Sequence, residues 1–133
     1  MRTKPMKRTE LGRCGEDEAA KYLEKCGYTV LFRNYRAGRL ETDIVCEDED
    51  HTVFVEVKTR TPASDKYGRP AAAVVGKKSD NLIRCAEAYL RAARAEGRKT
   101  KRPRIDVVEV YFDGGAAKIN HIKNAVIKKE DTP

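Results

Sequence analysis

Residues 40–60 read LETDIVCEDEDHTVFVEVKTR, and this stretch predicts the hairpin around which the rest of the chain is organised. From Thr52 to Lys58 every second residue is a valine, which is the period of a half-buried β-strand. The alternation places those valines on one face and Phe54, Glu56 and Lys58 on the other. An acid and a base therefore share one face of the predicted strand.

A second acid joins them if residues 41–46 form the preceding strand. With the turn centred between Glu49 and Asp50, residues whose numbers sum to 99 lie opposite each other, which pairs Asp43 with Glu56. Two carboxylates would then meet beside one lysine. A slip of one residue in this register would instead send Asp43 to the other face.

Composition favours a single soluble domain. The chain has 133 residues, of which 40% are hydrophobic and 37% charged, enough for one core. We expect one domain at residues 9–127, a flexible basic tail at 1–8 and a frayed tail at 128–133. No stretch approaches the ~18 apolar residues of a membrane span, and no apolar segment follows the basic N-terminus. These features favour a cytoplasmic protein without a signal peptide or a membrane partner.

The charge distribution narrows the class of partner. Residues 41–56 contain seven acids and no lysine or arginine, so the rest of the chain has 28 basic against 14 acidic residues. A basic surface around an acidic island suits a polyanion that meets a divalent cation. Glu47 to Asp50 are interpreted as solvated turn residues. The four cysteines include no C-x-x-C pair, so reduced thiols packed as small hydrophobes are expected rather than a zinc site.

The first helix is expected from Thr9 to Cys26, ended by Gly27 as a left-handed cap. Its inward stripe consists of Ala19, Ala20, Leu23 and Cys26. Glu16 falls on the same stripe, where acids are rare unless they are paired or metal-bound. Glu16 therefore lies either near the acids of the hairpin or in a surface pair at the stripe's edge. Gly12 beside it would let the helix approach the sheet closely.

Three more strands and a second helix complete the predicted elements. The strands are Tyr28–Arg36, with Tyr28, Val30 and Phe32 on one face, then Ile105–Phe112 and Ala117–Ile122, the last two joined by the tight turn Asp113-Gly114-Gly115. The helix runs from Gly76 to Glu96, with Leu82, Ala86, Leu90 and Ala93 buried and Tyr89 flanking them. Asp106 is expected to have a structural role at the start of its strand.

Basic residues after the hairpin are candidates for nucleic-acid contact. The predicted loop from Arg60 to Pro70 carries Arg60, Lys66, Tyr67 and Arg69, an aromatic among basic residues as a nucleic-acid strand would meet. A flexible connector explains this loop equally well. Lys77, Arg84 and Arg91 recur every seven residues on the second helix, where a solvated face is the alternative. A denser cluster follows that helix and includes Arg98 and Lys101.

The acids and the lysine suit phosphodiester hydrolysis. Carboxylates around Mg²⁺ can activate a water and neutralise charge on the phosphate. Mg²⁺ prefers oxygen ligands, so two or three acids suffice without cysteine or histidine. Lys58, two residues after Glu56 on the same face, could orient the water or stabilise transition-state charge. Taken alone, D-x(12)-E-x-K is a weak pattern, because E-x-K occurs in many strands as a surface ion pair.

Several motifs together resemble a known nuclease family. They are Gly12-x-x-Gly15-Glu16, Gly27-Tyr28, Asn34-Tyr35-Arg36, Glu41-x-Asp43, Val53-Phe54-Val55-Glu56-Val57-Lys58-x-Arg60, Lys77 and Asp106-Val107-Val108. Their order resembles the PD-(D/E)XK nuclease core and is similar to archaeal Holliday-junction resolvases. A closer resemblance is to the YraN-type bacterial family. Leu40 and Thr42 depart from the G-E-I-D usual there, and Ile105 replaces an aromatic.

The resemblance implies an α/β fold with a mixed central sheet flanked by helices, as in restriction endonucleases. It further implies that Asp43, Glu56 and Glu16 hold Mg²⁺, with Mn²⁺ as a substitute and the Val57 carbonyl as a further ligand, and that Lys58 is catalytic. Resolvase-like proteins are often dimers, so a homodimer is one expectation.

Three functions remain open at this point. The first is a metal-dependent endonuclease acting on DNA rather than RNA, with branched or damaged DNA among its candidate substrates. The second is a non-catalytic nucleic-acid-binding accessory protein with the same fold. The third is a protein-interaction module whose surface is merely basic.

Overall fold

The computed structural model describes residues 8–60 and 76–125. Its elements in chain order are α1 (Arg8–Lys25), β1 (Thr29–Ala37), β2 (Leu40–Glu47), β3 (His51–Arg60), α3 (Gly76–Ala95), β4 (Arg102–Asp113) and β5 (Ala116–Ile122). The predicted tails, apart from Arg8, and the predicted loop after Arg60 lie outside the described residues. The boundaries of the predicted helices and strands otherwise agree with the structure to within a few residues.

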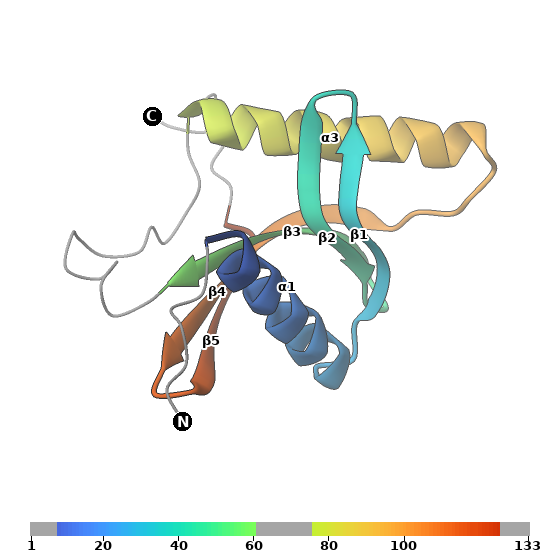
Figure 1. Ribbon diagram of the computed structural model, residues 1–133. Coiled ribbons are helices and arrows are strands. Elements are labelled where there is room, and N and C mark those ends of the chain that lie inside the picture. The colour runs from blue at the N-terminus through green and yellow to red at the C-terminus, as the bar shows by residue number, and fades with distance from the viewer. Residues whose placement is uncertain (1–7, 61–75, 126–133) are drawn as a thin grey trace, which may run out of the picture.

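The five strands form one mixed sheet in the order β1-β2-β3-β4-β5. β3 and β4 are parallel, and the other neighbouring strands are antiparallel. The two helices cover opposite faces of this sheet (Figure 1). The predicted α/β class, with a mixed sheet flanked by helices, is therefore confirmed.

Each helix packs through the residues that its periodicity indicates. On one face, α1 contributes Ala19, Ala20 and Leu23, which pack against Ile44, Cys46, Val53, Val55, Val108 and Val110. On the other face, α3 contributes Ala86, Tyr89 and Ala93, which pack against Val45 and Phe54. The alternation predicted for the hairpin is thus present, with the odd-numbered valines of β3 facing α1.

Glycine ends both helices in the same way. Gly27 has a φ of 97°, and the N–H of Tyr28 donates to the Leu23 carbonyl at 3.0 Å. The same pattern follows α3 at Gly97, whose φ is 74°. These are Schellman caps, which satisfy carbonyls that would otherwise lack partners. Cys26, predicted to lie inward, is exposed because it occupies the capping position beyond the last helical turn.

A bulge in β1 overturns the predicted face of Phe32. The β1–β2 register shifts between Val30 and Phe32, because Leu31 is an extra residue on β1. Val30 stays on the α1 side, whereas Phe32 turns towards α3 and contacts the rings of Tyr35 and Tyr89. Phe32 is still 41% exposed.

Tyr89 is the centre of the α3 packing rather than its flank. It is 2% exposed, while Leu90, predicted to be buried, is only partly so. The ring of Tyr89 has edge contacts with Tyr35 and Phe54 at centroid distances of 5.1 and 5.4 Å. Its hydroxyl accepts a hydrogen bond from Arg98 at 3.2 Å, which allows the polar tip to be buried.

The register of the central hairpin is the one that the sequence predicted. The pairs Ile44↔Val55, Val45↔Phe54 and Cys46↔Val53 all have numbers that sum to 99. The described pairing runs from the hairpin turn as far as Ile44 and Val55. Asp43 and Glu56 are the next residues on each strand, so they lie at the point where the ladder stops.

Candidate active site

The backbone of β3 holds Asp43 at the end of the β2–β3 ladder. The N–H of Val57 donates to Asp43 Oδ2 at 2.7 Å. This side-chain hydrogen bond takes the place of the next rung of the ladder, so the carboxylate is fixed between the two strands. The family resemblance implied the Val57 carbonyl as a ligand, and the structure adds the Val57 N–H as the group that orients Asp43.

Asp43 and Glu56 form a crowded acid pair. Burial, then a hydrogen bond and the charge of Glu56, raise the pKa of Asp43 from 3.8 to about 8, against the lowering effect of the Val57 N–H. The negative charge of Glu16 adds to the rise. Two carboxylates this close cannot both ionise without a counter-charge. Near neutral pH the pair therefore carries a proton that a cation could displace.

Lys58 follows Glu56 on the same face of β3, as predicted. It is half-buried and lies beside Glu109 in the parallel β3–β4 register. Glu56 and Lys58 both take part in interactions within the chain. Glu109 is 2% exposed, and its Oε1 accepts a hydrogen bond from Asn120 at 2.8 Å. The acid pair and the lysine thus occupy neighbouring positions on the face of the sheet that does not pack against α1.

Gly15 brings α1 against β3 and so brings Glu16 towards the hairpin. A Cβ at Gly15 would overlap Thr59 Oγ1, whereas a Cβ at Gly12 would meet nothing within 4 Å. The close approach predicted for Gly12 is therefore wrong, and Gly15 has that role because it faces the sheet. Glu16 is the next residue, and its charge is felt at Asp43.

Glu16 lies at the border of the site rather than inside it. It lines a groove of about 750 Å³ between α1 and the β1–β2 hairpin, together with Arg13, Arg33, Asn34, Arg36 and Glu41. Burial raises the pKa of Glu16, while the charge of Arg33 and a hydrogen bond from Asn34 act in the opposite direction. The sequence left two positions open for Glu16, near the acids of the hairpin or in a surface pair. The structure has features of both, because the charges of Glu16 and Asp43 interact and Arg33 lies close to Glu16.

The donor set fits a hard divalent cation held by two carboxylates. Within residues 8–60 and 76–125, no three histidine, cysteine, aspartate or glutamate side chains are grouped to hold a metal ion. Mg²⁺ nevertheless keeps several waters and is often bound through one or two carboxylates. Such an ion would replace the proton that burial and the neighbouring Glu56 keep on Asp43.

The described residues among those predicted to contact nucleic acid each have different surroundings. Arg60 Nε lies 3.9 Å from Glu109 Oε2, and Arg84 is exposed on α3. Arg98 stacks over the Phe32 and Tyr89 rings. Lys101 Nζ donates to the Asp48 carbonyl at 2.6 Å. Lys66, Tyr67 and Arg69, and the side chain of Lys77, lie outside the described residues.

Two features of the site were missed by sequence reasoning. Asn34 has a φ of 54° inside β1, and Arg33 and Arg36 line the groove next to Glu16. Arg33 pairs with Asp17 at 2.7 Å and Arg36 with Glu41 at 2.9 Å. The sequence did contain a signal for these residues, since Asn34-Tyr35-Arg36 was one of the motifs that carried the family resemblance. No role had been assigned to that motif.

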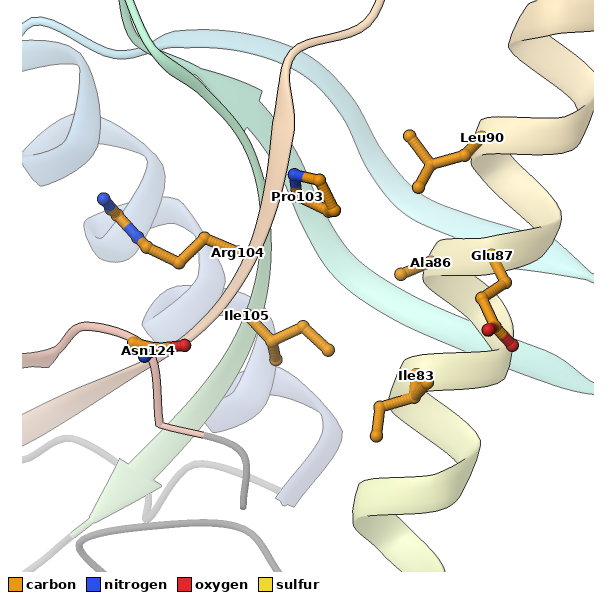
Figure 2. Close-up of a pocket in the computed structure, with 8 residues that line it drawn as sticks. All are labelled: Ile83, Ala86, Glu87, Leu90, Pro103, Arg104, Ile105 and Asn124. Carbon is orange, nitrogen blue, oxygen red and sulfur yellow. The ribbon is translucent and has the colours of Figure 1, made fainter. Parts of the chain in front are cut away.

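A second cavity lies between α3 and β4, away from the acid pair. It has a volume of about 320 Å³, and its walls are mainly Ile83, Ala86, Leu90, Pro103 and Ile105. Figure 2 shows Arg104 directed away from the α3 side chains. Glu87, Arg104 and Asn124 complete its lining.

Asp106 belongs to a structural network, as expected. It is fully buried and accepts hydrogen bonds from Arg104 at 2.9 and 2.8 Å. His121 Nε2 lies 2.7 Å from Asp106 Oδ2, and the Asn124 N–H donates at 2.9 Å. The Tyr22 hydroxyl lies 3.1 Å from His121 Nδ1. This network ties α1, β4 and β5 together.

Comparison with known proteins identifies close relatives. Residues 15–110 match the model of a family described as "Uncharacterised protein family UPF0102". A UPF0102 protein of Syntrophomonas wolfei is 45% identical over 116 residues, covering 87% of this chain and 96% of the relative. One from Caldicellulosiruptor saccharolyticus is 42% identical over 122 residues, covering 90% and 99%.

One solved structure is similar at a low level. It is Pyrococcus furiosus SfsA in complex with Ca²⁺, with 15% identity and a TM-score of 0.38 over 86% of this chain and 62% of that one. A TM-score this low does not establish a common topology. In the described residues, no helix is both long and apolar enough to cross a membrane.

Proposed function

This chain belongs to the uncharacterised protein family UPF0102, and from that premise we propose that it is a Mg²⁺-dependent endonuclease that hydrolyses DNA phosphodiester bonds. The YraN-type membership that the motifs indicated is confirmed. The single observation that supports the activity is the Asp43–Glu56 pair at the end of the β2–β3 ladder, with Lys58 on the same face. We further propose that these elements form a PD-(D/E)XK core.

Each residue of the site would have a distinct task. Asp43 and Glu56 would hold the ion, which when bound supplies an activated water and neutralises charge on the phosphate. The Val57 N–H keeps Asp43 oriented towards the gap between the strands. Lys58 would orient the attacking water or stabilise charge on the phosphate. Glu16 would add negative charge from α1 and so favour binding of the cation.

The substrate proposal rests on charge. Outside residues 41–56 the chain has 28 basic and 14 acidic residues, which favours a polyanionic partner. We propose DNA before RNA, with branched or damaged forms as candidates, and Mn²⁺ as a substitute for Mg²⁺. Binding should weaken steeply with salt, because each phosphate contact releases a counterion. A homodimer remains part of the proposal, since a branched substrate offers two scissile strands.

The test is metal-supported cleavage of linear, branched and damaged DNA by the wild type and by Glu56→Ala. We expect Mn²⁺ or Mg²⁺ to support cleavage and the variant to lose at least about 100-fold, as when a group that stabilises transition-state charge is removed. Asp50→Ala, which removes an exposed turn acid, is the matched control and should cleave normally. Undiminished cleavage by Glu56→Ala would assign the activity to a contaminant.

A non-catalytic binding protein is the second candidate. The observation that favours it is that, in the described part of the chain, no three histidine, cysteine, aspartate or glutamate side chains are grouped to hold a metal ion. Salt-dependent DNA binding without turnover across the whole substrate panel would support this function. Retained affinity in Glu56→Ala would support it further, because a pure binder does not need the acid pair.

A further inference from the structure

Asn34 occupies an unusual backbone position across from Asp43. The β1–β2 pairs on either side of Asn34 have residue numbers that sum to 77, which places it opposite Asp43. Its φ of 54° lies in the left-handed region. Such a conformation inside a strand is rare, because the Cβ crowds the following carbonyl. Conformations of this kind gather at functional sites.

The side chain of Asn34 is directed to the acid on α1. Asn34 and Glu16 line the same groove between α1 and the β1–β2 hairpin, and a hydrogen bond from the Asn34 side chain lowers the pKa of Glu16 against the effect of burial. Glu16 in turn acts electrostatically on Asp43. Asn34 therefore stands on β1 opposite Asp43 of β2, with its side chain on Glu16 of α1.

We infer that Asn34 is a positioning residue of the proposed metal site. Its left-handed backbone directs the amide to Glu16 and holds that carboxylate beside the Asp43–Glu56 pair. Asparagine suits this position because it tolerates positive φ better than most residues and its amide can donate to an acid. The inference rests on the proposed function, since it assigns Asn34 a task in cation binding.

A second residue with the same backbone supplies the control. Among the described residues, Asn34 and Asn124 are the two non-glycine residues with positive φ, and Asn124 has a φ of 52°. Asn124 contacts Asp106 through its backbone N–H. Glycine adopts this conformation freely. Asn34→Gly and Asn124→Gly therefore remove an amide side chain from the same type of backbone without adding strain.

The first measurement is the affinity for Mn²⁺, determined from the electron paramagnetic resonance signal of the free ion. We expect Asn34→Gly to weaken binding about 10-fold, as loss of an outer-shell partner typically does. Its unfolding temperature should not fall, and Asn124→Gly should bind Mn²⁺ like the wild type. Glu16→Ala should weaken binding similarly, and the double variant should lose no more than either single one. Wild-type affinity in Asn34→Gly would overturn the inference.

The second measurement needs no metal and separates this inference from the proposed function. In ¹⁵N-labelled protein, the side-chain amide protons of Asn34 should lie downfield in the wild type and move upfield in Glu16→Ala. Unchanged resonances would overturn the contact on which the inference depends. If the wild type binds no Mn²⁺, the metal site itself is contradicted, and the amide resonances alone decide whether Asn34 positions Glu16.

Discussion

Asp43 and Asp106 are acids of one sheet that the protein treats in opposite ways. Burial alone would raise the pKa of Asp106, but hydrogen bonds from His121 and Arg104 hold it below its usual value. Burial also acts on Asp43, yet its nearest side-chain partner is another acid, and its pKa rises to about 8. Burial acts to raise the pKa of both acids. Hydrogen-bond donors outweigh this effect at Asp106, whereas a second acid adds to it at Asp43.

The difference separates structure from function. A buried acid whose oxygens all accept hydrogen bonds links the strands and helices that carry the donors, and a ligand would not stabilise it further. A crowded acid pair lowers the stability of the free protein, and it persists in a natural sequence when a ligand relieves it. The electrostatic contrast thus supports a cation site at Asp43 and a structural role at Asp106.

The largest expected effect is loss of stability in Asp106→Ala. The substitution leaves the Arg104 and His121 side chains, which are 13% and 5% exposed, without their carboxylate. Removing one partner of a buried charged pair typically costs about 3–5 kcal/mol. Urea unfolding should show this loss relative to wild type. Asp50→Ala, at an exposed turn, should change stability by less than ~0.5 kcal/mol, and a similar value for Asp106→Ala would remove the structural side of the comparison.

Asp43→Asn should act in the opposite direction. The amide keeps the shape of the carboxylate, can accept from the Val57 N–H and can donate to Glu56. It also removes a like charge, so the metal-free protein should gain about 1–2 kcal/mol, since each pKa unit corresponds to about 1.4 kcal/mol before solvent screening. Mn²⁺ binding should be lost in the same variant. Reduced stability together with retained Mn²⁺ binding would contradict the assignment.

The pH dependence of stability provides a smaller and independent comparison. The raised pKa of Asp43 contributes stability that is fully present below about pH 3.8 and is lost as pH rises through about 8. The lowered pKa of Asp106 contributes stability that is present above pH 3.8 and is lost as pH falls through its lower folded value.

Between pH 5 and 9 the contribution of Asp106 is constant, so the Asp43 contribution can be isolated. Metal-free wild type should lose about 1 kcal/mol more than Asp43→Asn over that range, measured by urea unfolding at several pH values, after screening is allowed for. Saturating Mg²⁺ should reduce the difference, because the ion replaces the proton. Parallel curves for the two proteins would show that Asp43 does not titrate there.

Much of the hairpin could be predicted from the sequence, because a period of two and a turn together fix a register. Asp43, Glu56 and Lys58 were placed correctly on these grounds. The position of Glu16 could be narrowed to two alternatives, but its relation to Asp43 depends on how closely α1 approaches β3. That approach leaves no room for a side chain at Gly15, because a Cβ there would overlap Thr59 Oγ1, and periodicity does not reveal this.

The misplaced residues share a physical cause, which is a local departure from regular geometry. The bulge at Leu31 moved Phe32 to the other face, and the left-handed Asn34 was hidden inside a strand. Tyr89 was predicted at the flank, and its burial depends on a donor from Arg98 nine residues later. Neither a bulge nor a distant donor changes the hydrophobic pattern from which such predictions are made.

The smallest expected effects come from substitutions in α1. The first half of this helix affects Asp43, and its second half contacts the network around Asp106. Gly15 faces Thr59 of β3 and the charge of Glu16 acts on Asp43, whereas Tyr22 contacts the Asp106 network through His121. Gly15→Ala gains helix propensity but would collide with the Thr59 side chain, whose Cβ and Cγ2 lie 3.2 and 3.3 Å from the added Cβ. Overpacking costs about 1–3 kcal/mol and helix propensity returns up to about 1.

We therefore expect Gly15→Ala to lose about 1 kcal/mol of stability and to weaken Mn²⁺ binding, because the shift of α1 moves Glu16 away from the acid pair. Gly12→Ala adds the same methyl to the same helix in open space, so it should gain up to about 1 kcal/mol and bind Mn²⁺ normally. His121 ring resonances should be unchanged in both variants, because the Asp106 end of α1 is not displaced. Equal stabilities for the two alanine variants would show that Gly15 does not seat α1 at the site.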